Sequence, residues 1–335
     1  MYDVSKCAPQ EALRDLDMAK KRWFKKQARK PRFKKRGRCR DSYRMTGAIK
    51  TTKKHIQLPK VGKIRTKEDT SKLKGRILSA TISRSADRWF CSLRVLRSVE
   101  EPERPTGKPV GIDLGIKSFV VDSNKEFIKA PKPLKAHLKK LQRLSRQLSR
   151  KEKGSRRRRK AKLALAREHA RIHNIRMDFL HKISSHYAKT TRVICLEDLH
   201  VAGMVRNHCL ARAISDVGMG YFRAMLEYKC AWYRSHLVKV SRWFPSSKQC
   251  CRCKHKKDDL KLSNRIFRCS SCGLVLDRDL NAAKNILIEG LESSGLIKHY
   301  PKFQGKLRSW RSKANCCVSN GDLGSEKQVP NVSFG

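Results

Sequence analysis

The chain has 335 residues, and its 80 Lys and Arg residues against 29 Asp and Glu give a formal net charge of +51. Such an excess of positive charge opposes compaction unless a polyanion neutralises it, which argues against an enzyme with a small neutral substrate and favours a nucleic-acid partner. The sequence has no run of about 18 apolar residues and no apolar segment near its start, so it predicts neither a membrane span nor secretion.

The first predicted element is a helix within residues 10–30, where Leu13, Leu16, Ala19 and Trp23 recur at spacings of three and four. The segment then becomes basic, because 13 of the 21 residues from position 20 to position 40 are Lys or Arg. Aromatic rings can stack on bases while cations hold phosphates, so we expect nucleic-acid contact here, with a solvated charged face as the alternative. The predicted contact residues are Lys20, Lys21, Arg22, Trp23, Lys25, Lys26, Arg32, Phe33, Lys34, Lys35 and Arg36.

Residues 53–97 are predicted to form strands. Branched and aromatic residues fill 77–83 and 89–95, and the stretch 85–87 between them suits a hairpin turn. Residues 98–108 carry two prolines and a glycine and are predicted to be a linker.

A second domain is predicted from Val110, with short strands at 110–113, 119–121 and 127–128. Leucines and other apolar residues then repeat at helical spacing on both sides of residues 154–155, which predicts a helical hairpin. Its tip is basic. The two interpretations are a contact with a phosphate backbone and a loop that only keeps the protein soluble. The predicted contacts there are Arg156, Arg157, Arg158 and Arg159.

The rest of the chain is predicted to contain a buried strand at 192–197, a helix at 222–233 and a strand at 237–243. Residues 291–335 have few apolar positions in any period and are predicted to be a disordered tail.

Thirteen cysteines occur in a chain that lacks a secretion signal, so metal ligands or buried thiols are expected rather than a disulfide framework. Two Cys-x2-Cys pairs, separated by 15 residues, match a zinc ribbon. The predicted ligands are Cys250, Cys253, Cys269 and Cys272. A site closed by four thiolates is structural, so zinc is expected to stabilise the fold and to perform no chemistry. The spacing favours Cys250 over its neighbour Cys251 as a ligand.

Carboxylates stand where predicted strands end and a predicted helix begins. Asp113 ends one apolar strand, Glu197 ends another, and Asp277 and Asp279 lie where the helix starts. Such oxygen ligands suit magnesium or manganese, and two ions about 3.5–4 Å apart can clamp both oxygens of a phosphodiester displacement. Each acid alone also has an ordinary interpretation, such as a helix cap, an ion-pair partner or a turn residue.

These residues lie within motifs that resemble the TnpB (OrfB) family of insertion-sequence proteins, often described as transposases and related to the type V CRISPR nucleases. The motifs are GIDLGIKSFVV (111–121), ICLEDL (194–199), SSKQCCRC (246–253), RCSSCG (268–273) and DRDLNAAKNI (277–286), with QEALRDLDMAKKRWFKK and PRFKKRGRCRDSYR upstream. The resemblance covers about residues 8–290.

The resemblance implies an α/β fold whose RuvC-type, RNase H-like nuclease core carries an inserted zinc ribbon and follows a basic helical and β-rich nucleic-acid-binding region. The expected parts are a partial helical recognition region at 1–45, a β-rich, wedge-like domain at 46–105, a nuclease core at 109–245 and 274–290 that includes the helical hairpin 133–190, a zinc ribbon at 246–273 and the tail at 291–335.

The resemblance further implies an RNA-guided DNA endonuclease in which Asp113, Glu197 and Asp279 hold two magnesium or manganese ions. A guide RNA from the end of the element would read the target sequence by pairing, while the protein reads a short adjacent motif. DNA and this RNA are the expected partners, without a membrane. The expected location is the prokaryotic cytoplasm, in association with the nucleoid.

Members of the family usually carry a first strand and further helices before the point where this chain starts, so we expect either a misassigned start codon or an N-terminally truncated copy. Two alternatives follow. The chain could be an inactive copy that only binds nucleic acid, or it could be a guide-independent nuclease that selects branched DNA by its structure.

Overall fold

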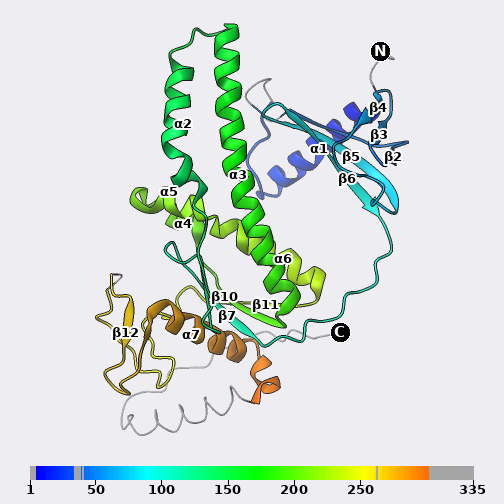
Figure 1. Cartoon of the computed structure of the whole chain (residues 1–335). Coiled ribbons are helices and arrows are strands. Elements are labelled where there is room, and N and C mark those ends of the chain that lie inside the picture. Colours follow the sequence, from blue (N-terminus) through cyan, green and yellow to red (C-terminus); the bar gives the residue numbers. More distant parts are fainter. Residues whose placement is uncertain (1–4, 34–38, 40, 262, 302–335) are drawn as a thin grey trace. The chain divides into compact units, whose positions relative to one another are not determined.

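The computed structural model of the chain describes residues 5–33, 39, 41–261 and 263–301 (Figure 1). Its residues cluster into two compact units. Unit 1 contains the chain up to Glu101 together with residues 136–174, and unit 2 contains residues 102–135 and the chain from Ile175 onward. Lys34, Lys35 and Arg36 of the predicted contact set lie outside the described residues, as does the predicted tail from position 302.

Unit 1 contains two small antiparallel sheets whose strands alternate between apolar and polar residues. The strands are β1 (Ser42–Met45), β2 (Lys50–Thr52), β3 (His55–Leu58), β4 (Gly62–Arg65), β5 (Arg76–Ser85) and β6 (Arg88–Leu96). One sheet has the order β1-β5-β6 and the other the order β2-β3-β4, and buried side chains from both share one apolar cluster. The strands β5 and β6 confirm the predicted hairpin, and its turn places Ala86 in the left-handed region at φ 54°.

Helix α1 (Cys7–Phe24) contacts β1 through charged residues rather than through its predicted apolar face. Leu13 and Leu16 are 66% and 43% exposed, whereas Glu11 is buried. Arg44 of β1 forms ion pairs of 2.7 Å with both Glu11 and Asp15. Carboxylates four residues apart lie one above the other on a helix, so one guanidinium can hold both and fix α1 on the sheet.

The predicted helical hairpin consists of α2 (Pro133–Ser149) and α3 (Arg156–Thr190). Within unit 1, Glu168 of α3 is buried and pairs with both His137 and Lys140 of α2, each at 2.6 Å. An ion pair and a histidine hydrogen bond on one buried carboxylate hold the pair of helices in register.

Unit 2 is built on a five-stranded mixed sheet (Figure 1). Its strands, in spatial order, are β9 (Phe127–Ile128), β8 (Val120–Asp122), β7 (Val110–Leu114), β10 (Val193–Glu197) and β11 (His236–Val240). The strands β7, β10 and β11 run parallel, whereas β8 and β9 continue from β7 as an antiparallel meander. The parallel strands read as continuous apolar runs because both of their faces are covered.

The two faces of this sheet are packed against different helices. Ile112 and Leu196 point into a core with residues of α3 and of α6 (Met219–Tyr233). Cys195 points to the opposite face, which packs against α7 (Arg278–Ser293). Helix α7 lies very close to β7, because a Cβ placed on Gly111 would come within 2.1 Å of the Ala283 carbonyl oxygen. Glycine at position 111 therefore allows the helix to rest on the strand backbone.

Three shorter helices and a hairpin complete unit 2. They are α4 (Val201–Met204), α5 (His208–Val217), the 3₁₀ helix η1 (Leu296–His299) and the hairpin of β12 (Ile266–Arg268) with β13 (Val275–Asp277). Order continues past the predicted start of the tail at position 291. Leu291 is fully buried, and Ile297 and Tyr300 pack against the same apolar cluster. No helix in the described part of the chain is long and apolar enough to cross a membrane.

Candidate carboxylate and cysteine sites

Asp113 and Glu197 lie beside each other at one edge of the unit 2 sheet. The parallel register pairs Leu196 with Ile112, so the next residue of each strand is one of the two acids. Since side chains alternate along a strand, both acids point to the same face as Gly111, which is the face that α7 covers.

Asp279 comes to this region in the first turn of α7. The residue that caps the helix is Asp277, whose Oδ1 accepts hydrogen bonds from the backbone N–H groups of Asp279 (2.9 Å) and Leu280 (3.1 Å). The ordinary role of a helix cap therefore applies to Asp277 and not to Asp279. Its carboxylate instead accepts hydrogen bonds from Nε and Nη2 of Arg278 at 3.2 and 3.0 Å, while Arg265 lies 3.9 Å away.

We call Asp113, Glu197 and Asp279 the carboxylate site. Burial acts on Asp113 and Glu197, and repulsion from the other acids acts on Asp113. Burial, the negative charge of Asp279 and that of Glu197 raise the pKa of Asp113 from 3.8 to about 7, while Arg278 partly opposes this rise. Burial alone raises the pKa of Glu197 from 4.5 to about 7. A divalent cation would favour the ionised forms that burial disfavours, so the donor set fits a hard oxygen-seeking ion.

The three carboxylates are less tightly gathered than the cysteines. Among the described residues, only Cys250, Cys253, Cys269 and Cys272 form a group of three or more possible ligands whose ligating atoms all lie within 4.8 Å of one another. In the carboxylate site, Arg278 already occupies one oxygen of Asp279.

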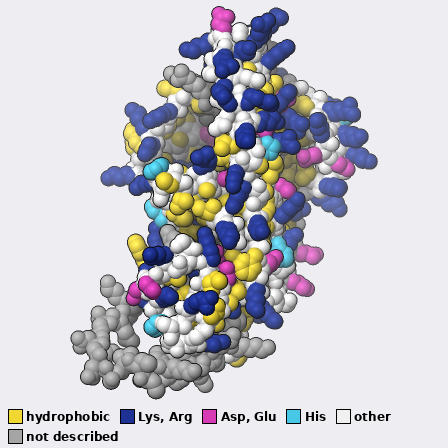
Figure 2. All heavy atoms as spheres, turned by 60° about the vertical axis from the view of Figure 1, so that its left-hand side comes forward, with side chains coloured by type: hydrophobic (Ala, Val, Ile, Leu, Met, Phe, Trp, Pro, Cys, Tyr) yellow, Lys and Arg dark blue, Asp and Glu magenta, His cyan; other side chains and the backbone are white. Residues whose placement is uncertain are grey.

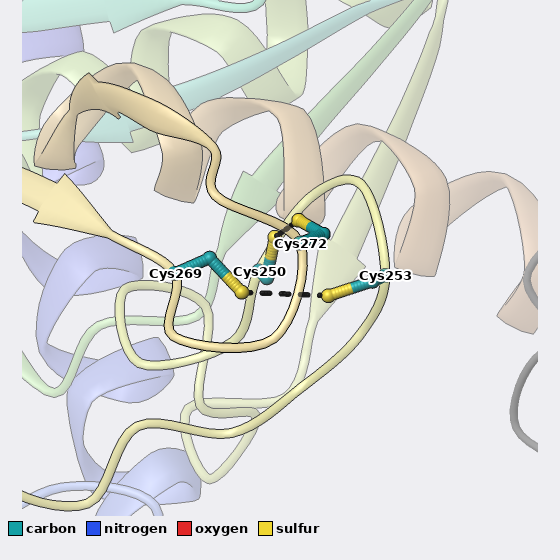
Figure 3. Close-up of side chains that lie close together, drawn as sticks. All are labelled: Cys250, Cys253, Cys269 and Cys272. Atoms are coloured by element: carbon teal, nitrogen blue, oxygen red, sulfur yellow. Dashed lines mark hydrogen bonds between the residues drawn. The ribbon is translucent and has the colours of Figure 1, made fainter.

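The four cysteines, which we call the cysteine site, converge from two turns (Figure 3). The Sγ atoms of Cys250 and Cys272 are 3.6 Å apart, and those of Cys253 and Cys269 are 3.5 Å apart. A tetrahedral ion with Zn–S bonds of 2.3 Å places its sulfurs about 3.8 Å from one another. The spacing therefore fits zinc, and every cysteine in the described part of the chain is free of disulfides.

The surroundings of the cysteine site shift the pKa values of its thiols in different directions. Burial raises the pKa of Cys253, and it also acts on Cys269. At Cys269, hydrogen bonds from the backbone of Cys272 and Ser271 and from the Cys253 thiol outweigh that effect and lower the pKa to about 7. Cys251 is not part of the group, as the spacing predicts.

Most of the predicted nucleic-acid contacts that the structure describes are exposed. Figure 2 shows Lys and Arg side chains crowding the tip of the α2–α3 hairpin. Arg156, Arg157 and Arg159 are exposed there, whereas Arg158 is half-buried and donates hydrogen bonds to the carbonyls of Leu148 (2.9 Å) and Lys151 (2.6 Å). Arg158 therefore closes the end of α2, which leaves its three neighbours available for a ligand.

The basic segment, which begins in the last turns of α1 and continues past its end, carries aromatic rings among its charges. Phe33 is 98% exposed, and the half-buried Trp23 lies 4.8 Å from Phe24, measured between ring centroids. The Lys30 ammonium lies 5.7 Å from the centre of the Trp23 ring. The remaining described contacts predicted here are all exposed, namely Lys20, Lys21, Arg22, Lys25, Lys26 and Arg32.

Sequence reasoning missed several polar contacts that lie beside these sites. Asp198, directly after Glu197, pairs with Arg223 of α6 at 2.7 Å and with Arg242 after β11 at 3.0 Å. Asn281 and Asn285 of α7 are fully buried and bonded to the loop that leads into the cysteine site. The available signal was two amides four residues apart on an otherwise apolar helix face.

Curated proteins are similar in sequence to this chain over most of its length. A "Putative RNA-guided DNA endonuclease" of Streptomyces pristinaespiralis is 41% identical over 299 residues, which cover 88% of this chain and 74% of that protein. The "Putative RNA-guided DNA endonuclease InsQ" of Escherichia coli K12 is 34% identical, with coverages of 84% and 73%. A protein of Mycobacterium tuberculosis with the same kind of name is 37% identical, and the chain spans only 60% of its length.

Two family models match adjacent parts of the chain. The OrfB model, described as "Probable transposase", matches residues 92–208, and the "Cas12f1-like, TNB domain" model matches residues 220–286. Among solved structures, a Cas12f1 complex with guide RNA and target DNA aligns with a TM-score of 0.45 at 16% identity, covering 74% of this chain and 59% of the other.

Proposed function

Since the chain belongs to the TnpB (OrfB) family, we propose that it is an RNA-guided DNA endonuclease that hydrolyses phosphodiester bonds at the carboxylate site with the help of magnesium or manganese. The observation that carries this proposal is the placement of Asp113 and Glu197 side by side, on the face covered by the helix that begins with Asp279. Two relatives whose alignments cover most of this chain are named as RNA-guided DNA endonucleases, which supports the same activity for this chain.

The topology of unit 2 supports a RuvC-type, RNase H-like core. Three antiparallel strands followed by two parallel ones, in the order β9-β8-β7-β10-β11, place both acid-bearing strands at the centre of the sheet. Acids at the ends of central strands can hold ions where a nucleic-acid backbone can reach them. The proposed boundaries are a core at 109–245 and 274–290 with a zinc ribbon inserted at 246–273.

The proposal gives different roles to the carboxylates, the cysteines and the exposed cations. When bound, the divalent ions supply Lewis acidity and lower the pKa of water. Asp113, Glu197 and Asp279 would hold the ions, and Arg278 orients the Asp279 carboxylate. The cysteine site would hold structural zinc. Exposed cations at the α2–α3 tip, and in and after the last turns of α1, would neutralise the guide RNA and the DNA.

The test is guided cleavage by the purified protein. We would express the chain with the DNA that flanks its element, purify the bound RNA, and add magnesium and a matched target library with a randomised flank. We expect cutting that requires both the match and Asp113, so Asp113→Ala should lower the rate by about 10³-fold or more, equivalent to about 4 kcal/mol of barrier. The control Asp258→Ala removes an exposed carboxylate and should cut normally.

Two outcomes would overturn the proposal. Cutting of branched DNA without RNA would show a structure-selective nuclease. Failure of the folded, RNA-bound protein to cut would show a nucleic-acid-binding protein without nuclease activity.

A further inference from the structure

The loop that enters the cysteine site is fixed to α7 by two asparagine side chains. Nδ2 of Asn281 donates to the Gln249 carbonyl oxygen at 2.7 Å, and its Oδ1 accepts from the Cys251 backbone N–H at 2.9 Å. Cys250 lies between these two bonded residues and is fully buried. The side chain of Asn281 therefore brackets the backbone on both sides of a cysteine of the site.

A second asparagine, one turn further along α7, reinforces this attachment. Nδ2 of Asn285 donates to the carbonyl oxygens of Ser246 (2.8 Å) and Gln249 (2.6 Å). Both asparagines are fully buried. A buried backbone carbonyl that loses its donor carries a desolvation cost, so the loop has little freedom to leave the helix while both amides are in place.

The other half of the cysteine site is joined to α7 through the backbone. Cys269 and Cys272 lie in the turn between β12 and β13, and β13 ends at Asp277, which is the N-cap of α7. Both cysteine pairs therefore connect to the first turns of the same helix, one through side-chain hydrogen bonds and the other through the chain.

A metal ion in the cysteine site would close these connections into a ring. The ring would run from the head of α7 through β13 to Cys272, across the ion to Cys250, and back to the helix at Asn281. Asp279 lies within this ring, between the cap Asp277 and Asn281. An ion that ties both turns together therefore restrains the turn of helix that carries Asp279.

We propose that Asn281 and Asn285 are positioning residues that couple zinc occupancy of the cysteine site to the placement of Asp279 in the carboxylate site. This inference rests on the proposed function for the role of Asp279, but the attachment of the loop is independent of it. The two side-chain amides form hydrogen bonds to the loop that apolar residues of similar size could not form.

The test uses the full chain and two measurements that need no cleavage. The first is the rate at which a chelator removes zinc, and the second is Mn²⁺ binding measured by electron paramagnetic resonance. Asn281→Ala is the main variant, and Asn285→Ala is a second one in case the first does not fold. Asn264→Ala, an exposed asparagine of the ribbon, is the matched control.

We expect zinc to leave Asn281→Ala about tenfold faster than the parent chain or the control, as loss of a group supporting a metal site commonly gives. In the parent chain, zinc removal should weaken Mn²⁺ binding about tenfold. In Asn281→Ala, Mn²⁺ binding should already be weak and should change little on zinc removal, because the two perturbations act on one connection.

Unchanged Mn²⁺ affinity after zinc removal from the parent chain would overturn the coupling. Zinc loss from Asn281→Ala and Asn285→Ala at the parent rate would overturn the attachment itself. Failure of the proposed function would look different, because Mn²⁺ binding would then be indifferent to Asp113→Ala while the effect of the asparagines on zinc release persisted.

Discussion

In the cysteine site all four ligands lie in two short turns, whereas the carboxylate site takes one acid from each of β7, β10 and α7. The sulfurs already stand 3.5–3.6 Å apart across the site, close to the spacing around a tetrahedral ion. The carboxylates are less compact, and Arg278 engages one of them.

The two sites also differ in how their ionisable groups affect folding when no metal ion is bound. Four thiols that can lose protons to an ion form a closed set, and such a site contributes to folding when it is filled. In the carboxylate site, Asp113 and Glu197 are half-buried beside each other, and the partial loss of solvent raises the pKa of each to about 7. A ligand site that opposes folding until its cation arrives is typical of a centre that performs chemistry.

The largest effect is expected from removing a ligand of the cysteine site. Cys253→Ser should abolish stoichiometric zinc binding and expose the ribbon to proteolysis between residues 246 and 277, because structural zinc contributes on the order of 10 kcal/mol to such small folds. Metal analysis and limited proteolysis would measure both. Cys251→Ser is the matched control and should keep zinc, since this neighbouring thiol lies outside the group. Equal zinc loss in both variants would contradict the assigned ligand set.

The same contrast explains what the sequence could predict. The grouping of the four cysteines was predictable because their spacing is local. The neighbouring positions of Asp113 and Glu197 at one edge of the sheet were predictable because each lies at or next to the end of an apolar strand, whereas their role as ligands stays a prediction. The sequence could not predict that the apolar residues of α1 are exposed. The helix is held by ion pairs of Arg44 with Glu11 and Asp15, and Arg44 belongs to a strand distant in sequence. The roles of Asn281 and Asp198 were also hidden, because their partners come from distant segments.

A change of opposite sign is expected when a ligand of the carboxylate site is neutralised. The pKa of Asp113 is raised from 3.8 to about 7, so between these values the folded chain binds more protons than the unfolded chain, and its stability falls as the pH rises. Asp113→Asn removes this penalty. Without divalent ions, it should raise the Tm by roughly 3–10 °C at pH 8 and by much less near pH 4.

Thermal unfolding at the two pH values, with and without 10 mM magnesium, would measure this effect. Magnesium should stabilise the parent chain at pH 8 and leave Asp113→Asn nearly unchanged, because the variant lacks a ligand. A lower Tm for Asp113→Asn in the metal-free state at pH 8 would mean that the carboxylate supports the fold, and the difference between the two sites would disappear.

The smallest effect is expected from the ion pairs beside Glu197. Asp198 lies between Arg223 and Arg242, and all three side chains are about one-third exposed, so Asp198→Asn should cost at most about 1 kcal/mol of stability. Its effect on cleavage should be larger, about 10-fold, because groups that orient metal ligands commonly carry that weight. The magnesium concentration that gives half-maximal cleavage should rise in the variant, whereas the zinc content should stay the same. An unchanged magnesium requirement would show that these arginines hold only the surface, and that the backbone bond from Asp198 to Val240 suffices to place Glu197.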